Sequence, residues 1–278
     1  MRPVHIISIL AAIAIIALFY FGGNIVPPKK AGEQQTAATE PHAVAPASFD
    51  SVLHAAKTNL PEHAREEVVS VETALAGVAD SGKMAVYFDS LGKIWQEHRQ
   101  PDIAAFYYLE AGKLENSEKK LTFAAQLLLE LARRAHSAEM QAWNGQKAIE
   151  GFRKVLEINP DNDTIKVLLA ESLIGTGSTM DGVLLLRDVT TSDPDNVPAN
   201  LILGQQGIVS GQLDKAMDRF ETVLKAEPEN VAALLGLAEV QKNKGNKEKA
   251  IELLEQAKKV MKNPDFDKDV DQYISTFK

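Results

Sequence analysis

The sequence predicts an all-α protein built from repeated pairs of helices, preceded by one transmembrane helix. Val197 to Asn230 contains two amphipathic runs, Pro198 to Val209 and Leu213 to Ala226, separated by a short turn. Glycines at such turns, and prolines after the second run, recur every 34 residues. These markers are Gly177, Gly211 and Gly245, and Pro160, Pro194 and Pro228. Two independent markers that keep one period indicate a repeat array.

An apolar run at the N-terminus predicts the transmembrane helix. Val4 to Phe21 carries no formal charge apart from the titratable His5, and the run continues to Val26. At 1.5 Å per residue, residues 4–26 can cross a bilayer core of about 30 Å. A cleaved signal peptide is the alternative, but its apolar region usually has only about 7–15 residues, and no clear small-residue cleavage site follows here. We therefore expect an uncleaved signal anchor in residues 1–26.

The segment after the span predicts a linker and then two helices. Residues 27–48 are rich in Ala, Pro, Thr and Gln and have almost no large apolar side chains, so they cannot offset the entropy of ordering. The next two helices are expected at Phe49 to Asn59 and Pro61 to Ala79, where Val68, Val71, Leu75 and Val78 share one face. Residues 49–84 are interpreted as an N-terminal helical cap or hairpin.

The repeats then fall into register over residues 85–264. The predicted units are 85–118, 119–162, 163–196, 197–230 and 231–264. The second unit has ten extra residues near Arg133 to Ala142, so either its first helix is extended or its turn is a longer loop. Residues 265–278 are expected to form a polar-faced capping helix, which the ends of repeat arrays need for solubility.

Several positions within the repeat have a physical role. The turn glycines permit a left-handed backbone, and Asn162, Asn196 and Asn230 can cap the helix that follows. A small residue at the twentieth position of each unit lets the paired helices approach, and a larger one four residues later fills the adjacent space. The small residues are Ala104, Ala148, Gly182, Ala216 and Ala250; the larger ones are Tyr108, Phe152, Leu186, Phe220 and Leu254. Trp95 is expected in the core and Trp143 against the inserted loop.

The repeat resembles the tetratricopeptide repeat (TPR). The resemblance lies in Leu203-Gly204, Ala216, Phe220 and Pro228, while Asn200 and Gly207 replace the usual aromatic residues. It implies a right-handed TPR superhelical solenoid of about five helix-turn-helix units, acting as a non-enzymatic binding scaffold. The whole layout resembles bacterial single-pass membrane-anchored TPR proteins, which implies an inner-membrane protein with its repeats in the periplasm.

Composition and motifs exclude several other functions. A net charge of −8 argues against a nucleic-acid surface, and the absence of cysteine removes disulfides and thiolate metal sites. The six histidines form no metal-binding spacing, and the nucleotide-binding and hydrolase motifs are missing. Glu110, Glu130, Glu171 and Glu239 are expected to be solvated on separate helices. We expect no catalytic residue, no cofactor and no metal.

Recognition is expected on the concave groove that the first helix of each TPR unit lines. The candidate residues are Phe123, Leu127, Leu131, Val167, Glu171, Ile174, Leu201, Gln205, Ile208, Leu235 and Glu239. Apolar side chains in a groove imply a partner that covers them, here another protein or a peptide. Three alternatives stay open: the helices of residues 49–79 fill the groove, the apolar residues pack against adjacent helices of the array, or copies of the chain associate.

The expected function is therefore a membrane-anchored TPR scaffold for the assembly of envelope or membrane complexes. The alternative is a periplasmic chaperone or accessory factor for exported proteins, of the translocon-associated or cytochrome-maturation type. A scaffold would have one reproducible partner, whereas a chaperone would bind many clients weakly.

Membrane orientation gives the first testable prediction. Arg2 precedes the span and Lys29 and Lys30 follow it, so the positive-inside rule is nearly balanced. Because a very short flank before a signal-like span usually stays inside, we expect the N-terminus in the cytoplasm. A reporter that is active only after export, fused after Lys278, should then be active. Activity of a cytoplasmic reporter at the same site, with a silent export reporter, would contradict this orientation.

Overall fold

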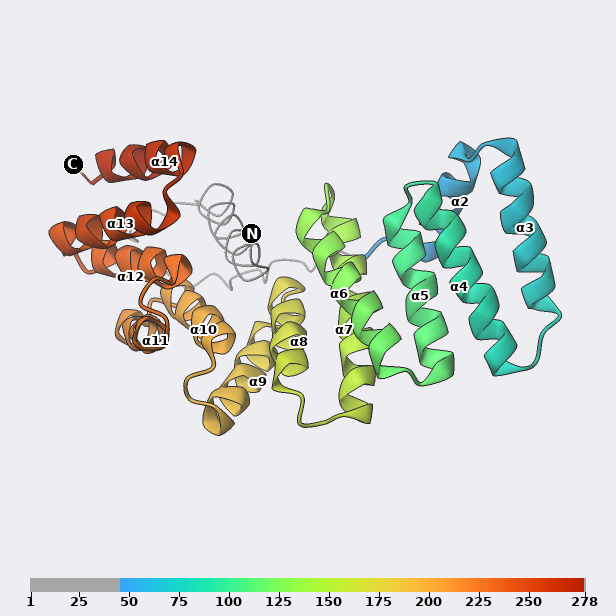
Figure 1. The fold of residues 1–278 in the computed structure, drawn as a ribbon, viewed down its shortest axis with the longest axis horizontal. Helices are drawn as coiled ribbons and strands as arrows, with labels where there is room; N and C mark the ends of the chain where they lie inside the picture. Colours follow the sequence, from blue (N-terminus) through green and yellow to red (C-terminus); the bar gives the residue numbers. More distant parts are fainter. Residues whose placement is uncertain (1–45, 278) are drawn as a thin grey trace, which may run out of the picture. The chain divides into compact units, whose positions relative to one another are not determined.

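The computed structural model describes residues 46–277, and thirteen helices account for nearly all of them (Figure 1). They are α2 (Phe49–Asn59), α3 (Glu62–Ala76), α4 (Ser81–Glu97), α5 (Pro101–Glu115), α6 (Glu118–Arg134), α7 (Ala138–Ile158), α8 (Asp163–Gly175), α9 (Thr179–Ser192), α10 (Val197–Val209), α11 (Leu213–Ala226), α12 (Val231–Asn243), α13 (Lys247–Met261) and α14 (Pro264–Ser275). The predicted span at residues 4–26 and nearly all of the predicted linker lie outside the described residues. Within residues 46–277, no helix is both long and apolar enough to cross a membrane.

The described residues divide into two compact units, 46–186 and 187–277, and the boundary falls within α9. The first unit holds α2 to α8 and the beginning of α9, and the second holds the end of α9 and α10 to α14. Each unit has its own apolar clusters. In the first unit they join α2 to α5 and α5 to α8; in the second they join α11 to α12 and α12 to α14.

Consecutive helices form antiparallel pairs, as the repeat predicts. The pairs α4 and α5, α6 and α7, α10 and α11, and α12 and α13 pack against each other within their units (Figure 1). We call α4, α6, α8, α10 and α12 the first helices, and α5, α7, α9, α11 and α13 the second helices. The prediction of an all-α TPR helical repeat array is therefore confirmed for the described residues.

The predicted turns and caps are confirmed in detail. Gly177, Gly211 and Gly245 have φ of 94°, 72° and 84°, in the left-handed region that glycine enters without a steric penalty. The side-chain oxygens of Asn162, Asn196 and Asn230 accept the backbone N–H three residues later at 3.0–3.2 Å. Each asparagine satisfies a donor that the first turn of a helix leaves without a partner.

Small residues face large ones where helices approach closely. The Phe220 ring of α11 lies against Gly204 of α10 and Gly236 of α12, and a Cβ on Gly204 would lie 2.7 Å from that ring. Gly92 of α4 faces the Tyr108 ring of α5 in the same way, and a Cβ there would lie 2.5 Å away. Ala104, Ala148, Ala216 and Ala250 are at most 1% exposed. The burial of these alanines agrees with their predicted place between paired helices.

The ten-residue excess is not a loop. The first helix α6 has 17 residues and the second helix α7 has 21, against 13 and 14 in α10 and α11, while only residues 135–137 connect α6 to α7. The first helix is extended, as one alternative predicted, but the larger share of the excess lies in the second helix α7, which neither alternative predicted, and the longer loop is wrong. Ser137 explains where α7 begins, because its hydroxyl caps the helix by accepting the Met140 N–H at 3.2 Å.

The N-terminal helices pack through one aromatic residue. Helix α2 has the predicted bounds, and the Phe49 ring lies 3.9 Å from the Phe106 ring of α5, between ring centroids, and 6.0 Å from Trp143 of α7. Trp143 is 4% exposed, but since no inserted loop exists it packs against these aromatic residues. Trp95 is fully buried, as predicted. The ring contacts of Phe49 are therefore with the second helices α5 and α7.

The last helix completes the second unit. Helix α14 begins at Pro264, one residue before the predicted 265, with the Asn263 side chain as its cap. Phe266, Val270 and Phe277 are 4–6% exposed and join a cluster with Leu235 and Leu254. Asp265, Lys268, Asp269 and Asp271 of α14 are exposed, so the helix covers apolar surface with one face and meets solvent with the other.

A glycine substitution tests the close approach. Gly204→Ala places a methyl group against the Phe220 ring, so we expect the free energy of unfolding to fall by about 1–3 kcal/mol because the core is overpacked. Gly175→Ala is the matched control, because a Cβ at Gly175 meets nothing within 4 Å. Urea unfolding followed by circular dichroism measures both, and equal stability of the two variants would contradict the packing described.

Candidate functional site

In unit 46–186 the structure separates the candidate groove residues by their exposure. Phe123 on α6 is 55% exposed. Leu127, Leu131, Glu171 and Ile174 are half-buried. Val167 on α8 is only 6% exposed and belongs to the core. At Val167 the alternative interpretation, packing against adjacent helices, therefore describes the side chain better than an open groove does.

In unit 187–277 the candidates divide in the same way. Leu201, Gln205 and Ile208 on α10 are half-buried, and so is Glu239 on α12. Leu235 is 5% exposed and packs in the cluster that includes Phe266 and Val270 of α14. The side chain of Leu235 is therefore covered by the chain itself.

Two exposed apolar side chains flank an ion pair on α4 and α6. Lys120 Nζ of α6 lies 2.5 Å from Asp89 Oδ2 of α4. Phe123 follows Lys120 by one helical turn, and Val86, which is 61% exposed, precedes Asp89 by one turn. The Phe123 ring also lies 5.9 Å from the Tyr108 ring, whose hydroxyl donates to Gln96 Oε1 at 2.7 Å. We call Val86, Phe123 and Tyr108 the apolar patch of the first unit.

Ion pairs join the first helices elsewhere in this unit. Arg133 near the end of α6 donates to Glu171 of α8 at 2.5 Å and to Glu130 of its own helix at 3.1 Å. These contacts neutralise Glu130 and Glu171, which the sequence analysis placed in solvent. A bidentate guanidinium between two helices also fixes their relative register.

Glu239 is engaged by the last helix. The Tyr273 hydroxyl of α14 donates to Glu239 and accepts a hydrogen bond from Lys242 Nζ at 2.9 Å, and Lys242 lies 4.4 Å from the centroid of the Tyr273 ring. Burial raises the pKa of Tyr273, and the hydrogen bond and charge of Glu239 raise it further. Glu239 is therefore not a free acid of a groove but part of the contact between α12 and α14.

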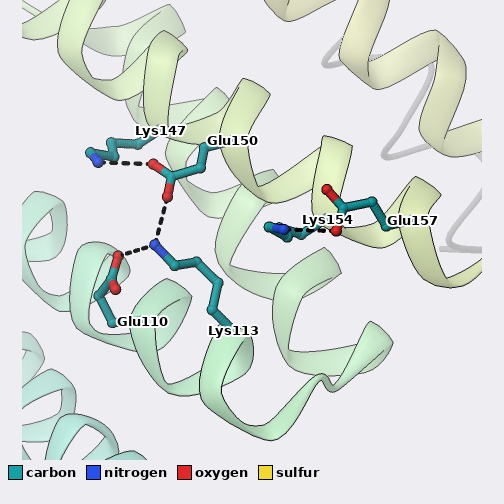
Figure 2. Close-up of polar contacts among 6 residues, drawn as sticks. All are labelled: Glu110, Lys113, Lys147, Glu150, Lys154 and Glu157. Carbon is teal, nitrogen blue, oxygen red and sulfur yellow. Dashed lines mark hydrogen bonds and ion pairs between the residues drawn. The ribbon is translucent and has the colours of Figure 1, made fainter.

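A second charged network lies on the second helices α5 and α7. Lys113 of α5 lies 2.6 Å from Glu110 and 2.5 Å from Glu150 of α7, and Lys147 lies 2.9 Å from the other oxygen of Glu150 (Figure 2). Burial alone would raise the pKa of the Glu150 carboxyl, but the hydrogen bonds and charges of Lys113 and Lys147 lower it below its ordinary value. The sequence analysis did not find this network, because its partners are 37 residues apart.

A hollow of about 540 Å³ adjoins this network. Its lining comes from α7, from the end of α8 and from the turn before α9. The lining residues are Gln146, Lys147, Ile149, Glu150, Arg153, Lys154, Glu157, Leu173, Thr176 and Ser178. None of them is among the candidate groove residues. The 34-residue period did not predict the hollow, because its lining residues do not recur at one position of the repeat.

The structure brings two histidines together that the sequence keeps apart. The rings of His63 on α3 and His98 after α4 lie 6.1 Å apart. Among the described residues, however, no group of three or more histidine, aspartate or glutamate side chains could hold a metal ion.

Comparison with known proteins places the repeat in a family. Residues 209–268, from the end of α10 to the beginning of α14, match the family model described as tetratricopeptide repeat. Together with the helical array, this match identifies a tetratricopeptide repeat in residues 209–268 of an all-α helical repeat array. Proteins of this fold are typically non-enzymatic. No curated protein matches the chain as a whole.

Solved structures share the fold at low sequence identity. A TPR protein from Parabacteroides merdae ATCC 43184 has 17% identity and a TM-score of 0.52, over 68% of this chain and 73% of its own. MamA residues 41 to the end, from Desulfovibrio magneticus RS-1, has 19% identity and a TM-score of 0.51, over 65% and 97%. YrrB, described as a TPR protein with an unusual peptide-binding site, has 17% identity and a lower TM-score of 0.47, over 68% and 92%. These likenesses concern the fold alone.

The network around Glu150 predicts a pH-dependent stability. Because the folded-state pKa of Glu150 is lowered, its contribution to stability is present above the ordinary glutamate pKa of about 4.3 and is lost as the pH falls through the folded value. Glu150→Gln should therefore destabilise the protein at pH 7 and have a much smaller effect near pH 3. Glu157→Gln, which affects a more exposed pair, is the control and should change little at either pH. A Glu150→Gln effect that is the same at both pH values would contradict this assignment.

Proposed function

We propose that this TPR scaffold is membrane-anchored and recognises partner proteins through the exposed side chains of its first helices. The apolar patch of the first unit carries the proposal. Phe123 and Val86 are 55% and 61% exposed, although large apolar residues are usually buried. They flank Asp89 and Lys120, and Lys120 also lies 2.8 Å from Glu115. Such a surface offers two exposed apolar contacts to an apolar side chain of a partner.

The partner's chemistry follows from this surface. An amphipathic helix or an extended segment with an aromatic or aliphatic anchor can cover Phe123 and Val86 and remove their apolar area from water. Leu127 and Leu131 continue the same helix toward Arg133, where charges again occur in pairs. Other proteins or peptides are therefore the proposed ligands, and homo-oligomerisation through the same patch is one form of this recognition.

The proposed membrane anchor and the proposed cellular location are supported by the sequence alone. The apolar run of residues 4–26 supports a single-pass anchor, and the layout supports an inner-membrane protein with periplasmic repeats that takes part in assembling envelope or membrane complexes. The second candidate is a chaperone or accessory factor for exported proteins. It is favoured by further exposed apolar residues outside the patch, such as Met180 and Leu184 on one face of α9, which suit weak binding of many clients.

A charge placed in the patch tests the proposal. A photo-crosslinking residue at Val86 in intact cells should capture one reproducible partner if the protein is a scaffold, and many clients if it is a chaperone. Phe123→Glu should lower the crosslinked yield at least about tenfold, since burying an unpaired carboxylate in an apolar contact is costly. Leu235 is unsuitable for this test, because its burial means that a charge there would unfold the second unit.

Val69→Glu is the matched control. Val69 on α3 is 49% exposed and lies outside the candidate groove, so the same charge change there should leave the yield unchanged. Circular dichroism should show both variants folded. Equal crosslinking by wild type and by folded Phe123→Glu would remove the patch as the recognition surface.

A further inference from the structure

The hollow beside α7 has the properties of a ligand site outside the candidate groove. Its volume of about 540 Å³ falls within the range of about 300–1,000 Å³ that is usual for ligand pockets. Ile149 of α7 and Leu173 of α8 contribute apolar groups to its lining and are 9% and 6% exposed. Polar and charged side chains of α7, together with Thr176 and Ser178, complete the lining.

The charges around the hollow are nearly all paired. Lys147 lies 2.9 Å from Glu150, and Lys154 lies 2.7 Å from Glu157, as Figure 2 shows. Arg153, in contrast, is exposed and forms no ion pair with any residue of the described chain. The lining therefore holds three cations and two carboxylates, and its one unmatched charge is the guanidinium of Arg153.

We propose that this hollow binds an acidic segment of a partner protein, with one carboxylate on Arg153 and a neighbouring aliphatic side chain on Ile149 and Leu173. A guanidinium presents parallel N–H donors that match the two oxygens of a carboxylate. Gln146 and Ser178 are also lining residues, and their side chains can form hydrogen bonds with the backbone of an extended peptide. The ligand is thus defined by one negative charge next to one apolar group.

The same pairing of charges disfavours other anions. A phosphate group carries about −1.5 to −2 charge and prefers several cations, but Lys147 and Lys154 are already neutralised by Glu150 and Glu157. A nucleic acid would need several unpaired cations in a line along its backbone, whereas the hollow provides a single unpaired cation. A single carboxylate matches the single free guanidinium.

This site is separate from the apolar patch. Its residues lie on α7 and around the turn from α8 to α9, whereas Phe123 and Val86 lie on α6 and α4. A variant that loses binding at one of these surfaces therefore still allows binding at the other surface to be measured. A partner that engages both would gain affinity from the joint contact.

Peptide binding to the purified full chain tests the proposal. Two short, capped and fluorescein-labelled peptides serve as probes, one with glutamate–leucine at its centre and one with glutamine–leucine. Fluorescence anisotropy should show that the glutamate peptide binds about tenfold more tightly than the glutamine peptide, and that added salt removes most of this difference. Arg153→Glu should abolish the preference for glutamate.

Two further variants locate the site. Arg187→Glu makes the same charge change on α9, outside the lining residues, and should leave the affinity for the glutamate peptide unchanged. Gln146→Trp fills the hollow while Arg153 stays in place, and should weaken the binding of both peptides. Equal affinity for the two peptides, equal loss in Arg153→Glu and Arg187→Glu, or no measurable binding by the wild type would each overturn the proposal. Since Arg153 is exposed and has no ion-pair partner in the described residues, its substitution should leave the circular dichroism spectrum unchanged.

Discussion

The described structure depends on the close approach of helices around a few large side chains. The Phe220 ring shows this constraint most clearly, because it fills the space that Gly204 and Gly236 leave on two different first helices. One side chain thereby fixes the spacing of three helices, α10, α11 and α12. Side chains in protein interiors are as densely packed as organic crystals, so a methyl group added on either side has no room. The pairing of Gly92 with Tyr108 repeats the arrangement in the other unit.

This packing also decides which groups remain for recognition. Because apolar side chains fill the space between helices, charged residues occur at the edges, where they meet partners from the next helix. Lys113 bridges Glu110 and Glu150, and Arg133 bridges Glu130 and Glu171. These pairs offset charge locally, where neighbouring helices meet. Beside them, an unpaired guanidinium or an exposed aromatic ring becomes the distinguishing feature.

The sequence predicted the features that neighbouring residues determine. A glycine in the left-handed region and an asparagine cap act within four residues of the backbone groups they serve, so Gly211 and Asn196 identify a turn and a helix start without tertiary information. The extra length of the second pair was harder to place, because inserted residues can extend a helix or a loop. Ser137 carried the missing signal: its position before Ala138 and Glu139 is typical of a helix N-cap. The Lys113–Glu150 pair lay beyond such reasoning, because only the stacking of α5 on α7 brings it together.

Exposure at the candidate groove shows why a repeat position does not define a binding residue. Phe123, Val167, Leu201 and Leu235 occupy the same position of four successive units. Their exposure nevertheless ranges from 55% at Phe123 to 5% at Leu235, with Leu201 between them. Periodicity assigns a residue to a helix face, but neighbouring helices decide how much of that face water reaches. At Leu235 the additional neighbour is α14, whose Phe266 and Val270 complete the cluster. A helix that caps an array for solubility therefore also covers groove positions.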